Sequence, residues 1–213
     1  AGQMFGPVSQ GYRTMADTIV ADALSVQTNI DDLETAARSN VAAAVDPSPD
    51  EVVDMGTVVT QVESDLAPLL AEQHVDLSIS RVGGPFLGLA NDANARRMVG
   101  RLLTALIDVS ETGTILVGQL VTETPHDDML QLRIVRPATI RFATASDLLD
   151  PGFSPEGEAP GAAVLSLGFS LRLVDSLARA AGGHLDIGHN ALTLHLRSAN
   201  SKAEAGLEAQ QGE

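Results

Sequence analysis

Residues 162–187 read AAVLSLGFSLRLVDSLARAAGGHLDI and carry the signals that decide the fold. Apolar residues recur at helical spacing, and Gly182-Gly183 is a typical C-terminal stop signal. The stretch therefore predicts a helix over Ala162–Ala181. Two short apolar segments follow at His184–Ile187 and Leu192–Leu196, and the turn residues between them predict a closing β-hairpin.

Upstream of this stretch, helical and strand patterns alternate. Asn91-Asp92 is a suitable N-cap for an amphipathic helix that continues to about Ile107. Thr114–Thr122 and Met129–Val135 are predicted strands, separated by turn residues. The other predicted elements are a helix over 51–74 with a break at Pro68, a strand over 75–79, a short segment over 86–90 and a short strand over 139–142.

This order of elements predicts an α+β fold. We expect a two-layer α/β sandwich, in which helices cover one face of a mixed or antiparallel sheet. A doubly wound fold is excluded because no strand is followed by a Gly-rich phosphate turn. The domain is predicted to occupy residues 46–197, and the tail over 198–213 lacks core residues and is expected to be flexible.

Composition narrows the function classes. The 213 residues contain 28 Asp and Glu against 13 Lys and Arg, a formal charge of −15, which argues against nucleic acid or an anionic membrane as partner. Cysteine is absent, so disulfides, thiolate catalysis and Cys-based zinc sites are excluded. No apolar run approaches the roughly 18 residues of a membrane-spanning helix. We therefore expect a cytoplasmic protein without membrane insertion.

Residues 1–45 carry an apolar seam with near-heptad spacing, and most of their acidic residues fall off the seam. A continuous helix of this length would extend about 50 Å, too far for one small domain to cover. We therefore predict a homodimer through this helix. Packing within one chain is the alternative, as is a pair of shorter helices with a bend near Asn29 or Asn40. The predicted dimer interface comprises Tyr12, Met15, Ile19, Val26, Ile30 and Leu33.

Several stretches resemble the ATP-binding domain of the histidine kinases, part of the GHKL or Bergerat-type family that includes gyrase and the mismatch-repair ATPases. Val53-Asp54-Met55 looks like the opening of that domain, and Arg97–Ser110 is similar to its asparagine-bearing helix. Asp150-Pro-Gly-Phe153 resembles the motif that begins the ATP lid. Leu167–Leu171 and Ala180–Gly183 resemble the helix after the lid and its Gly-Gly end. The likeness spans about residues 53–197.

The resemblance also implies ligand positions, and here the sequence departs from the family. Two asparagines one helical turn apart would hold magnesium and phosphate, and Arg101 and Ala105 stand in their places. The loop that would carry the adenine-reading Asp is replaced by residues 136–140, without Asp or Gly. Gly168 alone remains of the glycine-rich lid. The resemblance therefore implies a degenerate domain with no cofactor, no metal and no catalytic residue of the usual kind.

Phosphoryl transfer from a histidine is the alternative enzymatic function. Members of this family carry a phosphoacceptor His on the dimerising helix, but the N-terminal helix here has none. A dimeric helical bundle joined to a degenerate ATPase domain also resembles the bacterial histidine phosphotransferases. Two enzyme alternatives stay open. The first is a phosphotransferase or sensor kinase fragment whose His is upstream or atypical, and the second is a divergent ATP-binding enzyme.

Other polar residues are expected to be structural. His74 is expected at a helix end, His126 in a solvated turn, and three further His around the closing hairpin could approach one another, although their spacing matches no metal-site pattern. Ser166 and Ser170 lack a nucleophile motif. The loop over 150–161 is predicted to be a connector, with a residual lid or a partner-docking segment as alternatives. The remaining residues weighed at these places are Asp147, Asp150, Glu156, Glu158, His184, His189 and His195.

Taken together, these patterns predict a non-catalytic signalling protein of a two-component pathway. We expect it to act as a dimeric docking module for a response-regulator receiver domain or for a histidine kinase. A plain interaction module that shares only the fold is a further alternative.

Overall fold

The computed structural model describes residues 19–20, 51–122, 129–155 and 166–199. The long N-terminal segment therefore lies outside the described residues, apart from the helical pair Ile19 and Val20. The elements, in chain order, are β1 (Val52–Asp54), α2 (Met55–Asp65), α3 (Ala67–Gln73), β2 (Asp76–Val82), β3 (Leu87–Leu89), α4 (Asp92–Asp108), β4 (Ile115–Thr122), β5 (Met129–Val135), η1 (Ala138–Ile140), α5 (Ala145–Leu148), α6 (Leu167–Ala180), β6 (His184–Ile187) and β7 (Ala191–Arg197).

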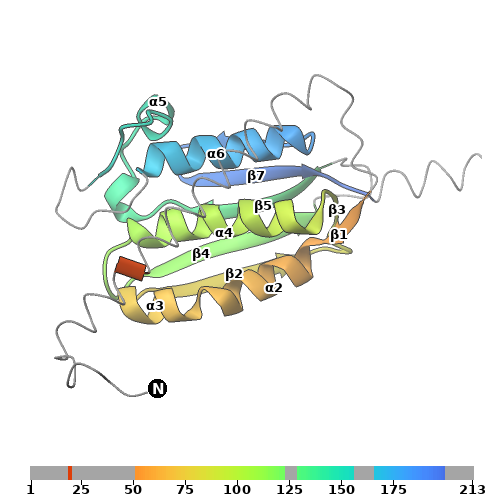
Figure 1. Ribbon diagram of the computed structural model, residues 1–213, viewed down its shortest axis with the longest axis horizontal. Coiled ribbons are helices and arrows are strands. Elements are labelled where there is room, and N and C mark those ends of the chain that lie inside the picture. The colour runs from red at the N-terminus through yellow and green to blue at the C-terminus, as the bar shows by residue number, and fades with distance from the viewer. Residues whose placement is uncertain (1–18, 21–50, 123–128, 156–165, 200–213) are drawn as a thin grey trace, which may run out of the picture.

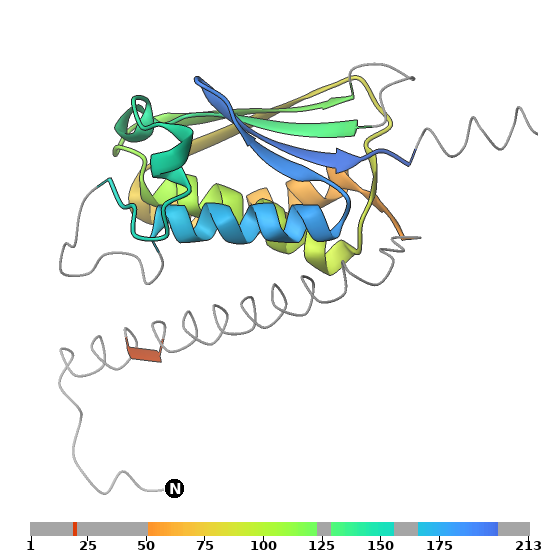
Figure 2. The ribbon, with the colours of Figure 1, turned by 90° about the horizontal axis from the view of Figure 1, so that it is seen from above.

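The main sheet has five strands in the order β2-β4-β5-β7-β6. Strands β2 and β4 are parallel, and every other neighbouring pair in this sheet is antiparallel. A separate two-stranded sheet joins β1 to β3. Helices α2, α4 and α6 lie across one face of the main sheet, as Figures 1 and 2 show. The predicted two-layer α/β sandwich with a mixed sheet is confirmed.

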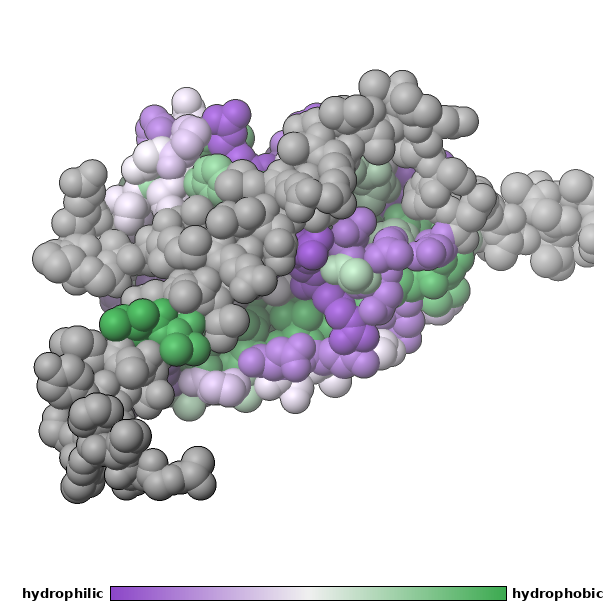
Figure 3. All heavy atoms as spheres, viewed as in Figure 1, coloured by the Kyte–Doolittle hydropathy of each residue, from purple (hydrophilic) through white to green (hydrophobic). Residues whose placement is uncertain are grey.

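The hydrophobic core fills the space between the two layers. Strands β4 and β5 turn alternate residues inward, so that Leu116, Leu120, Leu132 and Ile134 are buried while their neighbours face out. The helices contribute buried side chains at helical spacing, as an amphipathic helix does. On the helix-covered face shown in Figure 3, polar and apolar residues are interspersed.

Local signals place the ends of the helices. The side chain of Asn91 accepts a hydrogen bond from the backbone N–H of Ala93, which confirms the predicted cap of α4. At the end of α6, Gly182 has φ = +73°, a left-handed conformation that favours glycine, and the N–H of Gly183 donates to Ala178 O. The predicted Gly-Gly stop is therefore confirmed.

Three sequence predictions are corrected. The helix over 51–74 begins only at Met55, because residues 52–54 form β1, which pairs with β3. Its predicted break is confirmed, since α2 ends at Asp65 and α3 begins at Ala67 with Pro68 in its first turn. The strand over 139–142 is wrong, since η1 forms there after Pro137. The helix over 162–181 begins only at Leu167, because Ser166 has extended backbone and caps α6. Packing also continues past the predicted domain end, where the N–H of Ala199 donates to Leu87 O.

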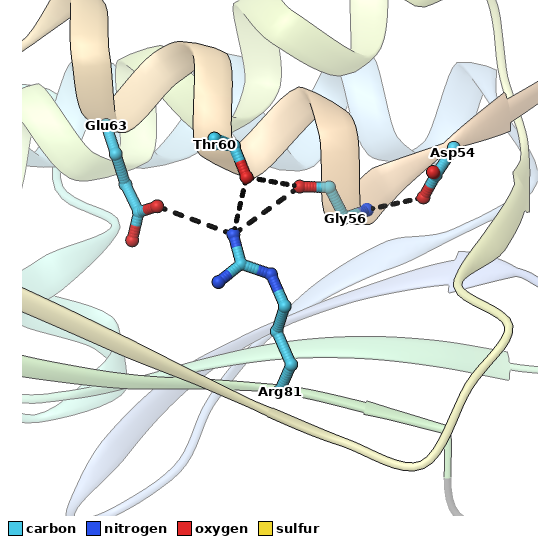
Figure 4. Close-up of polar contacts among 5 residues, drawn as sticks. All are labelled: Asp54, Gly56, Thr60, Glu63 and Arg81. Atoms are coloured by element: carbon cyan, nitrogen blue, oxygen red, sulfur yellow. Dashed lines mark hydrogen bonds and ion pairs between the residues drawn. The ribbon is translucent and has the colours of Figure 1, made fainter.

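A polar bridge ties α2 to strand β2 at the edge of the sheet (Figure 4). The Arg81 guanidinium donates to the Thr60 hydroxyl at 2.7 Å and pairs with Glu63 at 3.4 Å. Asp54 caps the same helix by accepting from the N–H of Gly56 and from the Thr57 hydroxyl. We refer to the contacts of Arg81 with α2 as the α2–β2 bridge.

Candidate functional site

The positions that the family resemblance assigns to nucleotide binding lie on segments that meet at one junction. Helices α4 and α6 pack side by side on the sheet (Figures 1 and 2), and the turn over 150–153 meets the N-terminal end of α6. Segment 136–140 follows β5 and reaches the C-terminal end of α4. We call these four pieces the α4–α6 junction.

On α4, the two positions that would hold magnesium lie one turn apart, as predicted. Ala105 is only 8% exposed and is flanked by the fully buried Leu102 and Leu106. A methyl group has no lone pair to offer a cation. Arg101 is partly exposed and carries a positive charge at the other position. Neither residue can therefore act as a magnesium ligand.

Gly168 packs its backbone directly against the turn over 150–153. A Cβ atom at this position would lie 1.7 Å from the carbonyl oxygen of Asp150, so no larger residue fits without movement of the turn. The N–H of Gly168 donates to Phe153 O at 3.2 Å. This close backbone approach gives a local reason for glycine at position 168 that does not involve a phosphate.

Two further donors near the start of α6 are also used within the chain. The N–H of Phe169 donates to the Ser166 hydroxyl oxygen at 3.1 Å, and the Ser166 hydroxyl donates to Pro151 O. A helix N-terminus binds anions through N–H groups that point outward without a partner. Here the N–H groups of Gly168 and Phe169 are already satisfied by the turn and the cap. This end of α6 is therefore poorly suited to hold phosphate.

Segment 136–140 fills the place of the adenine-reading loop with core contacts. Ile140 is fully buried, and the Thr139 hydroxyl donates to Val109 O at the end of α4. Arg136 is only 7% exposed, and its guanidinium donates to Ala143 O at 2.8 Å. Burial lowers the pKa of Arg136 below its ordinary value, and its Nε has no hydrogen-bond partner among the described residues. The sequence did not reveal this buried cation.

The histidines around the closing hairpin lie close together. His184 and His195 stand opposite each other on β6 and β7, and their rings stack with centroids 4.4 Å apart. His189 lines the same surface hollow as His195. Across the described part of the chain, no group of three or more His, Cys, Asp or Glu could hold a metal ion. His74 ends α3 in a left-handed conformation, as its predicted helix-end position requires, and His126 lies outside the described residues.

Several other polar residues make contacts within the chain or are buried in it. Ser170 is buried on α6, and Asp150 accepts from the N–H of Gly152. Asp147 forms a capping box with Thr144 at the start of α5, and these hydrogen bonds lower the pKa of the Asp147 carboxyl. Glu156 and Glu158 lie outside the described residues.

Most of the predicted dimer interface falls outside the described residues. Ile19 is the exception, since it is helical and 61% exposed in the single chain. The remaining interface positions, of which nothing is described, are Tyr12, Met15, Val26, Ile30 and Leu33.

No helix among the described segments is long and apolar enough to cross a membrane.

Comparisons with known proteins identify the fold. No model of a known protein family matches the chain, and no curated protein matches its sequence. Among solved structures, the Acinetobacter baumannii histidine kinase AdeS aligns with a TM-score of 0.63 and 15% identity, over 92% of this chain and 87% of that one. The cytoplasmic segment of histidine kinase QseC aligns with a TM-score of 0.52 and 11% identity, over 83% and 93%.

A third structure, full-length ShkA in complex with AMPPNP, aligns with a TM-score of 0.62 and 15% identity over 91% of this chain. The match spans 40% of ShkA, so this chain corresponds to part of that protein. Identities this low establish a shared fold and nothing finer. The chain has the fold of a histidine-kinase-like ATPase domain.

Proposed function

We propose that this chain is a non-catalytic signalling protein of a two-component-type pathway. In this proposal it forms a homodimer through the helix over residues 1–45 and binds no nucleotide. It acts as a docking module for a receiver domain or for a histidine kinase. The histidine-kinase-like fold supports the two-component assignment, and the α4–α6 junction is the reason for proposing that the chain does not catalyse phosphoryl transfer.

The observation that carries the proposal is the packing of the 150–153 turn on Gly168. A bound phosphate would need the backbone N–H groups at the start of α6, but the N–H groups of Gly168 and Phe169 donate to Phe153 and Ser166. Opening this end of α6 would break those hydrogen bonds and expose the surface beneath the turn. Buried Ala105 and Ile140 support the same conclusion, because neither supplies a polar ligand.

Calorimetric titration of the full chain with ATP and with ADP, both with magnesium, tests the loss of nucleotide binding. ShkA is a suitable positive control, since it was solved in complex with AMPPNP. We expect no heat of binding from this chain at concentrations at which the control saturates. A micromolar dissociation constant would overturn the proposal.

The enzyme alternatives need their own measurement. The full chain, incubated with labelled ATP or with a phosphorylated receiver domain, is expected to acquire no phosphate. Acid-labile label that disappears when a single His is changed would identify a phosphotransferase instead.

The dimer can be tested with two neighbouring residues that differ in their predicted role. Ile19 belongs to the apolar seam, whereas Val20 does not, yet both are helical and more than half exposed. We expect Ile19→Asp, alone or with Ile30→Asp, to shift the chain from dimer to monomer in light scattering at tens of micromolar, since it places a charge in the seam. Val20→Asp is the matched control and should remain dimeric. A monomeric parent chain would contradict the prediction.

A further inference from the structure

The outer face of the main sheet lies opposite the helices and carries two rows of polar side chains. One row runs across the strands as Gln119, Arg133, Thr193 and Asp186, each beside the next in the strand register. The adjacent row contains Gln131, His195 and His184. Neither row takes part in the α4–α6 junction, because the junction lies on the helix-covered face (Figure 2).

A hollow of about 370 Å³ lies over these rows, between strands β5, β7 and β6. Thr193 is 91% buried and belongs to its lining, and the ring of His195 is supported by the stacked ring of His184. The β6–β7 turn contributes further lining residues. The full lining is Gln131, Arg133, Asp186, Gly188, His189, Asn190, Ala191, Thr193 and His195.

The hollow is rich in hydrogen-bond donors. Arg133, Gln131, Asn190 and Thr193 all carry N–H or O–H groups, whereas Asp186 is the only carboxylate in the lining. The hollow thus combines one guanidinium with neutral amide and hydroxyl donors. It suits a ligand that supplies acceptor oxygens and negative charge, such as a carboxylate.

Arg133 is the cation best placed to bind such a group. Arg81 and Arg179 form ion pairs, and Arg136 donates to a backbone carbonyl. Among the described residues, no hydrogen bond or ion pair engages the guanidinium of Arg133, which is exposed beside the hollow. Its bidentate donor geometry is therefore available to an incoming carboxylate.

An aliphatic strip adjoins the hollow on the same face. Val135 follows Arg133 at the next outward position of β5, and the register of β4 and β5 places Val117 beside it, with Ile115 next along β4. The three side chains are between 47% and 61% exposed. The outer face thus presents an apolar strip that runs directly into a donor-rich hollow.

We infer that this outer face docks a segment of a partner protein that carries a carboxylate beside aliphatic side chains. The carboxylate enters the hollow and pairs with Arg133, and the aliphatic side chains cover Val117 and Val135. This inference rests on the docking role proposed above and names a surface and a partner chemistry for it. It does not depend on the state of the nucleotide region, so the nucleotide titrations and the experiment below can fail independently.

The test follows backbone amide signals of the isotope-labelled full chain by NMR. The probes are acetyl-Ile-Glu-Ile-amide, the neutral counterpart acetyl-Ile-Gln-Ile-amide, and inorganic phosphate. We expect the Glu peptide to shift the signals of β5 and β7 with a millimolar dissociation constant. The Gln peptide should bind about tenfold more weakly, because it lacks the charge that pairs with Arg133.

Two variants complete the test. Arg133→Met removes the guanidinium but keeps an apolar stem. It should weaken binding of the Glu peptide about tenfold. Arg172→Met makes the same change on α6, on the helix-covered side, and should leave binding unchanged. Equal binding of the two peptides, undiminished binding to Arg133→Met, or no shift at 10 mM peptide would overturn the inference. So would a response to phosphate alone, because that would identify a site for small anions.

Discussion

The α4–α6 junction and the α2–β2 bridge both hold helices in place, but they use different contacts. The junction is closed by buried side chains such as Leu106 and Leu171 and by direct backbone packing at Gly168. The bridge depends on one partly exposed arginine, whose partner Glu63 is also partly exposed. Buried apolar area contributes far more to stability than an exposed ion pair does. The comparison therefore assigns a larger share of the stability to the α4–α6 junction than to the α2–β2 bridge.

The largest effect is expected from truncating the junction core. Leu171 is fully buried on α6, so Leu171→Ala removes apolar contacts and leaves a cavity. We expect a loss of about 2–5 kcal/mol in the free energy of unfolding, measured by urea denaturation. A loss below about 1 kcal/mol would show that the junction is loosely packed and would remove the basis of the comparison.

A substitution at Gly168 tests the backbone contact itself. Gly168→Ala would force the 150–153 turn to move, and we expect a loss of about 1–3 kcal/mol in the same measurement. Gly100→Ala is the matched control, since Gly100 lies within α4 and its added Cβ would meet nothing closer than 4.0 Å. That control should be neutral or stabilising by up to about 1 kcal/mol. Equal effects of the two changes would argue against the close approach at Gly168.

The α2–β2 bridge should contribute much less to the free energy of unfolding. Arg81→Met removes the hydrogen bond to Thr60 and the ion pair to Glu63 while it keeps most of the apolar stem. We expect a loss of at most about 1 kcal/mol in the free energy of unfolding, and less at high salt. A loss comparable to that of Leu171→Ala would reverse the ranking of the two regions.

The smallest effect is expected from a polar contact at the rim of the junction. The pKa of Asp147 is lowered by its hydrogen bonds to Thr144. Its stabilising contribution is therefore present above the carboxyl pKa of the unfolded chain, near 4, and is lost as pH falls through the lower folded pKa. Asp147→Asn should slightly lower stability near pH 7, and this difference from the parent chain should disappear as pH falls, which flattens the acid limb of the stability–pH profile. A steep change near neutral pH would contradict this assignment.

Sequence reasoning predicted the elements that depend on local signals. The predicted bounds of β5 and of the closing hairpin, the Asn91 cap and the Gly-Gly end of α6 agree with the structure to within a residue. Strand β1 was missed because three residues become a strand only by pairing with β3, which is distant in sequence. The start of α6 was misplaced, although Ser166 before an apolar run is itself a cap signal.

The candidate site could be predicted only in part. That Arg101 and Ala105 offer no side-chain ligand to magnesium is visible in the sequence, because it follows from residue types alone. The need for glycine at position 168 depends on which backbone segments meet in space, and so does the burial of the Arg136 side chain. The position of Arg133 on the outer face, without a partner among the described residues, likewise becomes visible only once the strands are in register.

The order of strands in the main sheet has a consequence for how the chain folds during synthesis. Among the described strands, β7 comes last in the chain, lies between β5 and β6 and is the one neighbour of β6 in the sheet. A nascent chain that ends before Ala191 can pair only β2, β4 and β5, and it leaves one side of β5 uncovered. Contacts between residues far apart in sequence form slowly, so this uncovered strand is the point at which an incomplete chain is most exposed to aggregation. The sheet is therefore completed by its final seven residues, Ala191–Arg197.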